Sequence, residues 1–231
     1  MASGRRSSHY TLVDLRNLCI PATPEIKKAL ALILATSIGP DGGINPSKDI
    51  EQSDVCINGM FLNYGCFFGT DEEKLRSVVD FIVSQQLADG GFNCRLNRSG
   101  ARHSSMHSTI SVLEGIREYI VAGYAFRAEE LKRIEGEAQE FLLRHRLFKS
   151  DHTGAVIHPS FLKLVYPPRW RYDILRALDY FQSVGYPYDE RLQDALDILK
   201  EKRLSDGRWK TQTHHPGEVH FQMEQAGKPS R

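Results

Sequence analysis

Apolar residues recur along the chain at the three- and four-residue spacing of a helix face, in segments that alternate between more apolar and more amphipathic. The first pair comprises 10–20 and a helix opened by Thr23 as N-cap and Pro24 at the first helical position. The second comprises 55–68 and a helix opened by TDEE (70–73), a capping-box pattern. No run alternates with the period of a strand, so we predict an all-α protein.

Two further pairs follow the same order. The third begins near Ser104 and continues through the mixed-charge stretch 129–146, and the fourth opens with RWRYDILRALDYF (169–181). Positions predicted to face inward in the amphipathic members are Leu131, Ile134, Ala138, Phe141, Leu142, Leu192, Ala195, Leu196 and Leu199. Short loops between the two helix types indicate two layers, although periodicity does not decide whether they close into a ring.

Each pair ends in a turn that contains aspartate and glycine. The turn aspartates stand at 41, 89, 151 and 206, at intervals of 48, 62 and 55 residues, as expected for stacked helical units. In such turns glycine adopts a positive φ at little cost and the aspartate bonds nearby backbone. We therefore predict about four helical-hairpin repeats, with an apolar residue behind each turn wedged between neighbouring units.

Composition narrows the functional classes. The 231 residues carry 30 basic and 29 acidic side chains, a net charge of +1, which gives no signature of nucleic-acid binding. No run approaches the length of a membrane span, and MASGRRSSHY lacks the apolar run of a signal peptide. Four scattered cysteines do not form a disulfide framework, so we predict a reduced, cytoplasmic protein. Its domains are predicted as a flexible N-terminus (1–9), a repeat domain (10–212) and a C-terminal loop or start of a further repeat (213–231).

The helix pairs and their turns, above all QQLADGGFNC (85–94) and KEKRLSDGRWK (200–210), resemble the α/α toroid of squalene-cyclase-like terpene cyclases and protein prenyltransferase β subunits. The resemblance covers roughly Tyr10–Lys210. SDVCINGM (53–60) and HSSMHSTISVLEGI (103–116) further resemble a bacterial prenyltransferase-like group. Toroids of this class have five or six helix pairs, so four pairs predict either a partial ring, which a second copy or a partner subunit would complete, or a sequence that ends before the ring does.

The same resemblance implies a zinc site. Prenyltransferase β subunits bind zinc through an Asp-x-Cys pair at the start of one inner helix and a histidine at the start of the next. Asp54 and Cys56 match the pair, and His107 follows Cys56 by 51 residues. Such a set leaves a fourth position open for a thiol-bearing substrate or a water. His103, four residues before His107 and on the same face of a continuous helix, and Cys94, after the second turn, are alternate ligands.

Each of these residues also has a purely structural interpretation. Asp54 suits a first helical turn through the helix dipole, Cys56 suits a small buried position, and His107 suits a hydrogen-bonded core histidine. An enzyme, a non-catalytic module that binds an apolar ligand or partner, and a protein with structural zinc therefore all stay open.

Some residues depart from the resembled families. Lys48 is the only basic residue in the stretch before Asp54, and Ile57 stands where a prenyltransferase has tyrosine, which weakens the case for diphosphate binding. The acidic motifs of class I and class II terpene cyclases are absent from the sequence, which argues against cyclisation. The expected activity, if the chain is an enzyme, is that of a zinc-dependent transferase acting on an isoprenoid or thiol-bearing substrate.

Two other clusters carry candidate chemistry. Arg169 and Arg171 could clamp a phosphate or carboxylate while Trp170 and Tyr172 line an apolar cavity, or the four residues could simply start a helix, with Trp170 packed between repeats. THHPGEVH (213–220) holds three histidines, and without a rigid frame we interpret it as a surface loop.

Overall fold

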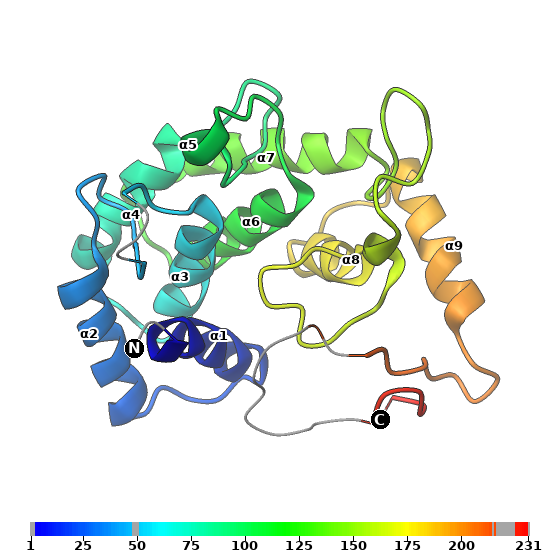
Figure 1. Cartoon of the computed structure of the whole chain (residues 1–231), viewed down its shortest axis with the longest axis horizontal. Coiled ribbons are helices and arrows are strands. Elements are labelled where there is room, and N and C mark those ends of the chain that lie inside the picture. The colour runs from blue at the N-terminus through cyan, green and yellow to red at the C-terminus, as the bar shows by residue number, and fades with distance from the viewer. Residues whose placement is uncertain (1–2, 48–50, 214, 216–224, 231) are drawn as a thin grey trace. The chain divides into compact units, whose positions relative to one another are not determined.

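Figure 1 shows the computed structural model of the chain, which describes residues 3–47, 51–213, 215 and 225–230. These residues form helices joined by loops, with isolated β-bridges in place of strands. The all-α prediction is confirmed. The helices are α1 (Ser3–Asn17), α2 (Pro24–Ser37), α3 (Val55–Phe67), α4 (Glu72–Ser84), α5 (Leu96–Ser99), α6 (Met106–Val121), α7 (Ala128–Arg144), α8 (Ile174–Ser183) and α9 (Gln193–Lys202), with short 3₁₀ helices η1 (Pro159–Leu162) and η2 (Glu190–Leu192).

The chain divides into two compact units, Met1–Phe141 and Leu142–Arg231, with the boundary near the end of α7. The sequence predicted a single repeat domain over 10–212. Most of the predicted C-terminal segment, including His214 and His220, lies outside the described residues, as does Lys48. None of the described helices combines the length and apolar character that a membrane span requires.

The helix starts follow local sequence signals in part. Thr23 is the N-cap of α2, and its hydroxyl accepts a hydrogen bond from the Ile26 N–H at 3.4 Å. The first helix begins at Ser3, inside the segment expected to be a flexible N-terminus, and ends at Asn17 rather than near residue 20. The five positions of α7 predicted to face inward are all buried.

The capping box predicted at 70–73 is wrong. The N-cap of α4 is Asp71, which makes no side-chain capping hydrogen bond. Glu72, the first residue of α4, accepts hydrogen bonds from the N–H groups of Ala125 and Phe126, at 2.5 and 2.7 Å, and from the Tyr119 hydroxyl at 2.8 Å. Its carboxylate thus fastens the loop between α6 and α7.

The core of the first unit is built around α3, which packs mainly against α6 (Figure 1). The two backbones meet at glycines. A Cβ on Gly59 would overlap the carbonyl of Ser111, and a Cβ on Gly115 would lie 2.5 Å from the Gly59 carbonyl oxygen. Ten of the thirteen residues of α3 are buried, in keeping with its almost continuous apolar sequence.

The first two Asp-Gly turns carry an identical set of side-chain contacts. Asp41 accepts hydrogen bonds from the N–H and hydroxyl of Ser53, both at 2.7 Å, just before α3. Asp89 binds the N–H of Ser104, at 2.8 Å, and its hydroxyl in the same way, just before α6. Each turn is therefore tied to the start of the helix that follows it.

A second pair of contacts extends the correspondence. The N–H of Ile44 donates to Asn58 Oδ1 at 2.6 Å, and the N–H of Phe92 donates to Thr109 Oγ1 at 3.0 Å. Ile44 and Phe92 are both fully buried, as predicted for the apolar residue behind each turn. The repeated contacts place two candidate site residues at equivalent positions, because Cys56 and His107 are each the second residue of the helix that follows the turn.

The two later turns lack these contacts, and only the fourth keeps the backbone hydrogen bonds of the first two, with the Leu204 N–H bonded to the Arg208 carbonyl. In the third, Ser150 N–H bonds the Ala155 carbonyl, which makes it one residue longer than the turn closed by Gly39 and Gly43. Its positive-φ residue is Gly154, so Asp151 does not occupy the place of Asp41 or Asp89. In the fourth, Asp206 bonds the backbone and guanidinium of Arg208 within its own turn.

Candidate functional site

Two cysteines from different parts of the first unit meet at the N-terminus of α3. The sulfur of Cys94 accepts hydrogen bonds from the backbone N–H of Cys56 and from the hydroxyl of Ser108, both at 3.3 Å. The thiol of Cys56 is hydrogen-bonded to the same sulfur. Ser108 is fixed in turn, because its oxygen accepts the N–H of Cys94 at 3.1 Å.

These contacts give the two thiols opposite acidities. The hydrogen bond from Cys56, followed by that from Ser108, lowers the pKa of Cys94. The pKa of Cys56 is raised well above its usual range, chiefly by its hydrogen bond to Cys94 and then by burial. Both cysteines are half-buried. The arrangement favours a thiolate at Cys94, whose sulfur accepts the Cys56 N–H at the positive dipole end of α3.

Asp54 stands beside this pair. It is the N-cap residue of α3, yet its side chain makes no capping hydrogen bond. The negative charge of Asp54 opposes the ionisation of both cysteines. It adds to the rise in the pKa of Cys56 and partly offsets the lowering of the pKa of Cys94. An aspartate that does not cap its helix and lies near two sulfurs differs from the simple first-turn acid that the sequence allowed.

The two candidate histidines lie in different settings. His107 is the half-buried second residue of α6, and its carbonyl accepts the Ser111 hydroxyl at 3.2 Å. His103 is exposed and lies in the connection before α6, where its carbonyl accepts the Asn93 amide at 2.8 Å. The expected continuous helix through both is wrong, because α6 begins at Met106.

The structure therefore places the Cys94 sulfur against the backbone of Cys56, with the charge of Asp54 nearby, and places His107 at the matching position of the neighbouring helix. Within the described ranges, no three His, Cys, Asp or Glu side chains converge as a ready-made metal site. Sequence reasoning underrated Cys94 and missed Ser108. The available signal was that Ser108 follows His107 directly, at a helix start that an Asp-Gly turn precedes.

The RWRYD cluster belongs to the second unit and precedes α8 instead of forming its first turn. Tyr172 is buried and donates its hydroxyl hydrogen to the Leu147 carbonyl. The Arg171 guanidinium stacks over Trp170, 4.7 Å from the ring centroid, and the Arg171 carbonyl accepts the Arg176 guanidinium at 2.8 Å. These contacts hold the loop before α8 together.

The helix itself is capped by Asp173. Its carboxylate accepts the N–H of Arg176 at 2.9 Å and the N–H of Val165 at 3.3 Å. Burial raises the pKa of Asp173 to about 6. No role was predicted for Asp173, since the pattern of an aspartate before an apolar helix is equally typical of a helix cap and of a solvent-exposed acid.

A comparison of the sequence with models of known protein families gives no match, and no curated protein matches it either. The functional argument therefore depends on the geometry of the thiol pair and on the resemblance carried by the motifs.

Proposed function

We propose that this chain is a helical-repeat protein that binds zinc through Cys56 and Cys94, with Asp54 and His107 as further ligands. The observation that carries the proposal is the hydrogen bonding of Cys94 Sγ by the Cys56 N–H and the Ser108 hydroxyl, which holds the Cys94 sulfur at the N-terminus of the helix that carries Cys56. The repeated frame around Asp41 and Asp89 supports the accompanying proposal of an α/α toroid.

The donor types fit a thiophilic metal. Thiolate, imidazole and carboxylate are the groups that zinc prefers, and its ligands must be deprotonated to bind. The lowered pKa of Cys94 favours the required thiolate. Asp54 is not engaged in capping α3, so its side chain can serve as a ligand without loss of a helix cap.

The residues around the pair have separate tasks. Ser108 orients the Cys94 sulfur through its hydroxyl, and Asp54 adds negative charge next to the two sulfurs. Zinc bound there would supply Lewis acidity that lowers the pKa of a coordinated thiol or water. Because the motifs resemble those of protein prenyltransferase β subunits, we propose a transferase that acts on an isoprenoid or thiol-bearing substrate. Ile57, next to Cys56, departs from the diphosphate-binding pattern of that family. The proposed metal site therefore has more support than the proposed substrate.

Cobalt substitution tests the ligand set without requiring turnover. Wild-type protein refolded or purified with Co²⁺ should show sulfur-to-cobalt charge-transfer absorption, and elemental analysis of protein grown with zinc should show stoichiometric metal. Cys56→Ala or Cys94→Ala should weaken binding by a factor of about 100 or more, because the loss of one ligand exceeds the cost of losing a supporting group. Cys19→Ser removes an exposed cysteine elsewhere and serves as the matched control.

His107→Ala separates the four-residue site from a simple thiol pair. If His107 is a ligand, the cobalt spectrum should shift and affinity should decrease by a factor of about 10 to 100. A small thiol added to the cobalt protein should perturb the spectrum of a site with an exchangeable position and leave a saturated structural site unchanged. Absence of metal binding by the wild type, or equal binding by the double variant lacking both cysteines, would overturn the proposal.

A further inference from the structure

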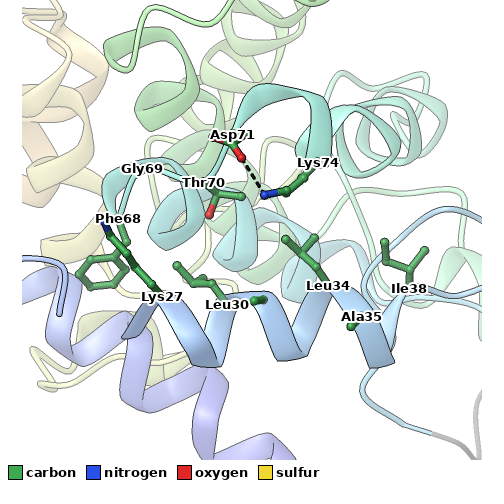
Figure 2. Close-up of a pocket in the computed structure, with 11 residues that line it drawn as sticks. Lys27, Leu30, Leu34, Ala35, Ile38, Phe68, Gly69, Thr70, Asp71 and Lys74 are labelled. Atoms are coloured by element: carbon green, nitrogen blue, oxygen red, sulfur yellow. Dashed lines mark hydrogen bonds and ion pairs between the residues drawn. The ribbon is translucent and has the colours of Figure 1, made fainter. Parts of the chain in front are cut away.

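The first unit contains a groove that no part of the metal proposal uses (Figure 2). It runs between α2 and the connection from α3 to α4, with a volume of about 610 Å³, within the ordinary range for small-molecule sites. Its lining residues are Lys27, Leu30, Ala31, Leu34 and Ala35 from α2, Ile38 directly after α2, and Phe68, Gly69, Thr70, Asp71 and Lys74 from the opposite wall.

The α2 wall is apolar along its length. Leu30 and Leu34 face the groove between Lys27 at one end and Ile38 at the other (Figure 2). From Lys27 to Ser37, the last residue of α2, the helix runs about 15 Å, and Ile38 follows it directly. Ile38 keeps 46% of its surface exposed, and Ala31 and Ala35 are exposed as well. The groove therefore presents an elongated apolar strip of the kind that an extended hydrocarbon chain would cover.

The polar groups gather on the opposite wall and at one end. Thr70 is only 8% exposed, and its hydroxyl has no hydrogen-bond partner among the described residues. Figure 2 shows this hydroxyl turned toward α2. Its backbone is held on both sides, because the N–H donates to the Gly65 carbonyl at 2.9 Å and the carbonyl accepts the Tyr124 hydroxyl at 2.6 Å. A buried hydroxyl without a partner costs free energy that a bound ligand would recover.

The charges around the groove sum to one positive charge. Lys74 is paired with Asp71 at 2.7 Å, which neutralises both side chains. Lys27 is exposed at the end near Phe68, and no ion pair joins it to another side chain in the described part of the chain. This balance suits a ligand with a single negative charge instead of a phosphate or a polyanion.

We propose that the groove binds a free single-chain carboxylate amphiphile, with the hydrocarbon chain along Leu30, Leu34 and Ile38 and the carboxylate near Lys27 and the Thr70 hydroxyl. The apolar strip supplies most of the affinity and the lysine sets the charge preference. This site is independent of the zinc proposal, since it uses neither Cys56 nor Cys94.

Calorimetric titration of the full chain with dodecanoate, below its micelle concentration, tests the groove directly. Wild-type protein should bind dodecanoate with saturable stoichiometry and should bind the dodecylammonium cation at least tenfold more weakly. Ala35→Trp, which fills the groove, should weaken dodecanoate binding at least tenfold. Leu32→Trp is the matched control, because Leu32 lies on the same helix, is 61% exposed and does not line the groove.

Two polar variants test the head-group position. Lys27→Gln should weaken dodecanoate binding about tenfold and remove most of its salt dependence, while Lys28→Gln, on the neighbouring exposed lysine, should change neither. Thr70→Val should leave stability unchanged or higher and still weaken binding, a combination that a purely structural threonine would not give. Equal binding by wild type and Ala35→Trp, equal affinity for the ammonium amphiphile, or no binding by the wild type would each overturn the proposal.

Discussion

The first two Asp-Gly turns and the last two have similar sequences, but their side chains connect to different parts of the chain. Asp41 and Asp89 bond serines that precede the next helix, and the apolar residues behind those turns are fully buried. Asp206 bonds Arg208 in its own turn, and Val156, behind the third turn, is 43% exposed. The turn sequence therefore specifies the reversal of the chain, while a suitably placed serine decides whether the aspartate also anchors a helix.

The residues that hold the helix starts also differ between the two units. Asp54 and Asp173 both precede apolar helices, yet only Asp173 caps its helix with its side chain. In the first unit the serine–aspartate contact holds the helix start, which leaves Asp54 beside the cysteine pair. In the second unit the aspartate is buried and does the capping itself. Two matched comparisons between the units and one pH titration within the second unit test this difference, beginning with the largest expected effect.

Substitution of the turn glycines should distinguish a packed turn from an open one. Gly90 has φ +96°, and a Cβ there would lie 2.7 Å from the Glu137 carbonyl oxygen. Gly154 has φ +69° and nothing within 4 Å. Gly90→Ala should therefore lower the free energy of unfolding by about 3 kcal/mol, from backbone strain plus displacement of a packed helix, whereas Gly154→Ala should cost about 1 kcal/mol.

Urea denaturation followed by circular dichroism measures both values. Equal losses in the two variants would show that the first-unit turn is not packed against α7 as the structure has it.

The buried cap of α8 should give the second unit its own pH dependence. The folded pKa of Asp173, about 6, lies above the unfolded value, so its stabilising contribution is complete below about pH 4 and is lost as pH rises through 6. Asp173→Asn imitates the protonated form and still offers an oxygen to the Arg176 N–H. The stability of this variant relative to wild type should rise by about 2 to 3 kcal/mol between pH 4 and pH 7.

The measurement is the free energy of unfolding of both proteins at a series of pH values. A difference that stays constant with pH would contradict the raised pKa of Asp173.

Removal of the turn carboxylates should produce the smallest difference. Asp89→Ala leaves the N–H and hydroxyl of Ser104 without their partner and should cost about 2 kcal/mol. Asp206→Ala removes contacts with Arg208 only, at the surface, and should cause no measurable change. Thermal unfolding of the two variants gives the comparison, and a comparable loss in both would deny Asp89 its role as a helix anchor.

Helix positions were predictable wherever the signal was local. The buried face of α7 and the Thr23 cap follow from spacing and from a cap residue next to its helix. The capping box at 70–73 failed because α4 begins one residue later than the pattern predicts, with Asp71 as its N-cap, so the third helical position is Lys74 instead of Glu73. A pattern within four residues does not show at which of two neighbouring polar residues the packed helix will start.

The residues of the candidate site also differ in whether local sequence patterns could predict their positions. The positions of Cys56 and His107 at matching helix starts follow from the repeat, so the sequence could place them. The predicted face shared by His103 and His107 failed because α6 starts too late to include His103. The contact between Cys56 and Cys94 depends on a loop returning to the start of α3 across 38 residues.

By itself, the sequence determined the all-α class, the helix pairs, the Asp-Gly turns and the pairing of an acid and a thiol at residues 54–56, because each depends on neighbours along the chain. Only the tertiary structure decided that Cys94 would join Cys56, that Asp54 would not cap α3 with its side chain, and that the buried Thr70 hydroxyl would lie beside a groove with no hydrogen-bond partner among the described residues. Those features depend on which residues far apart in the sequence lie next to one another in space. The packing of the helices determines this, and local sequence patterns do not.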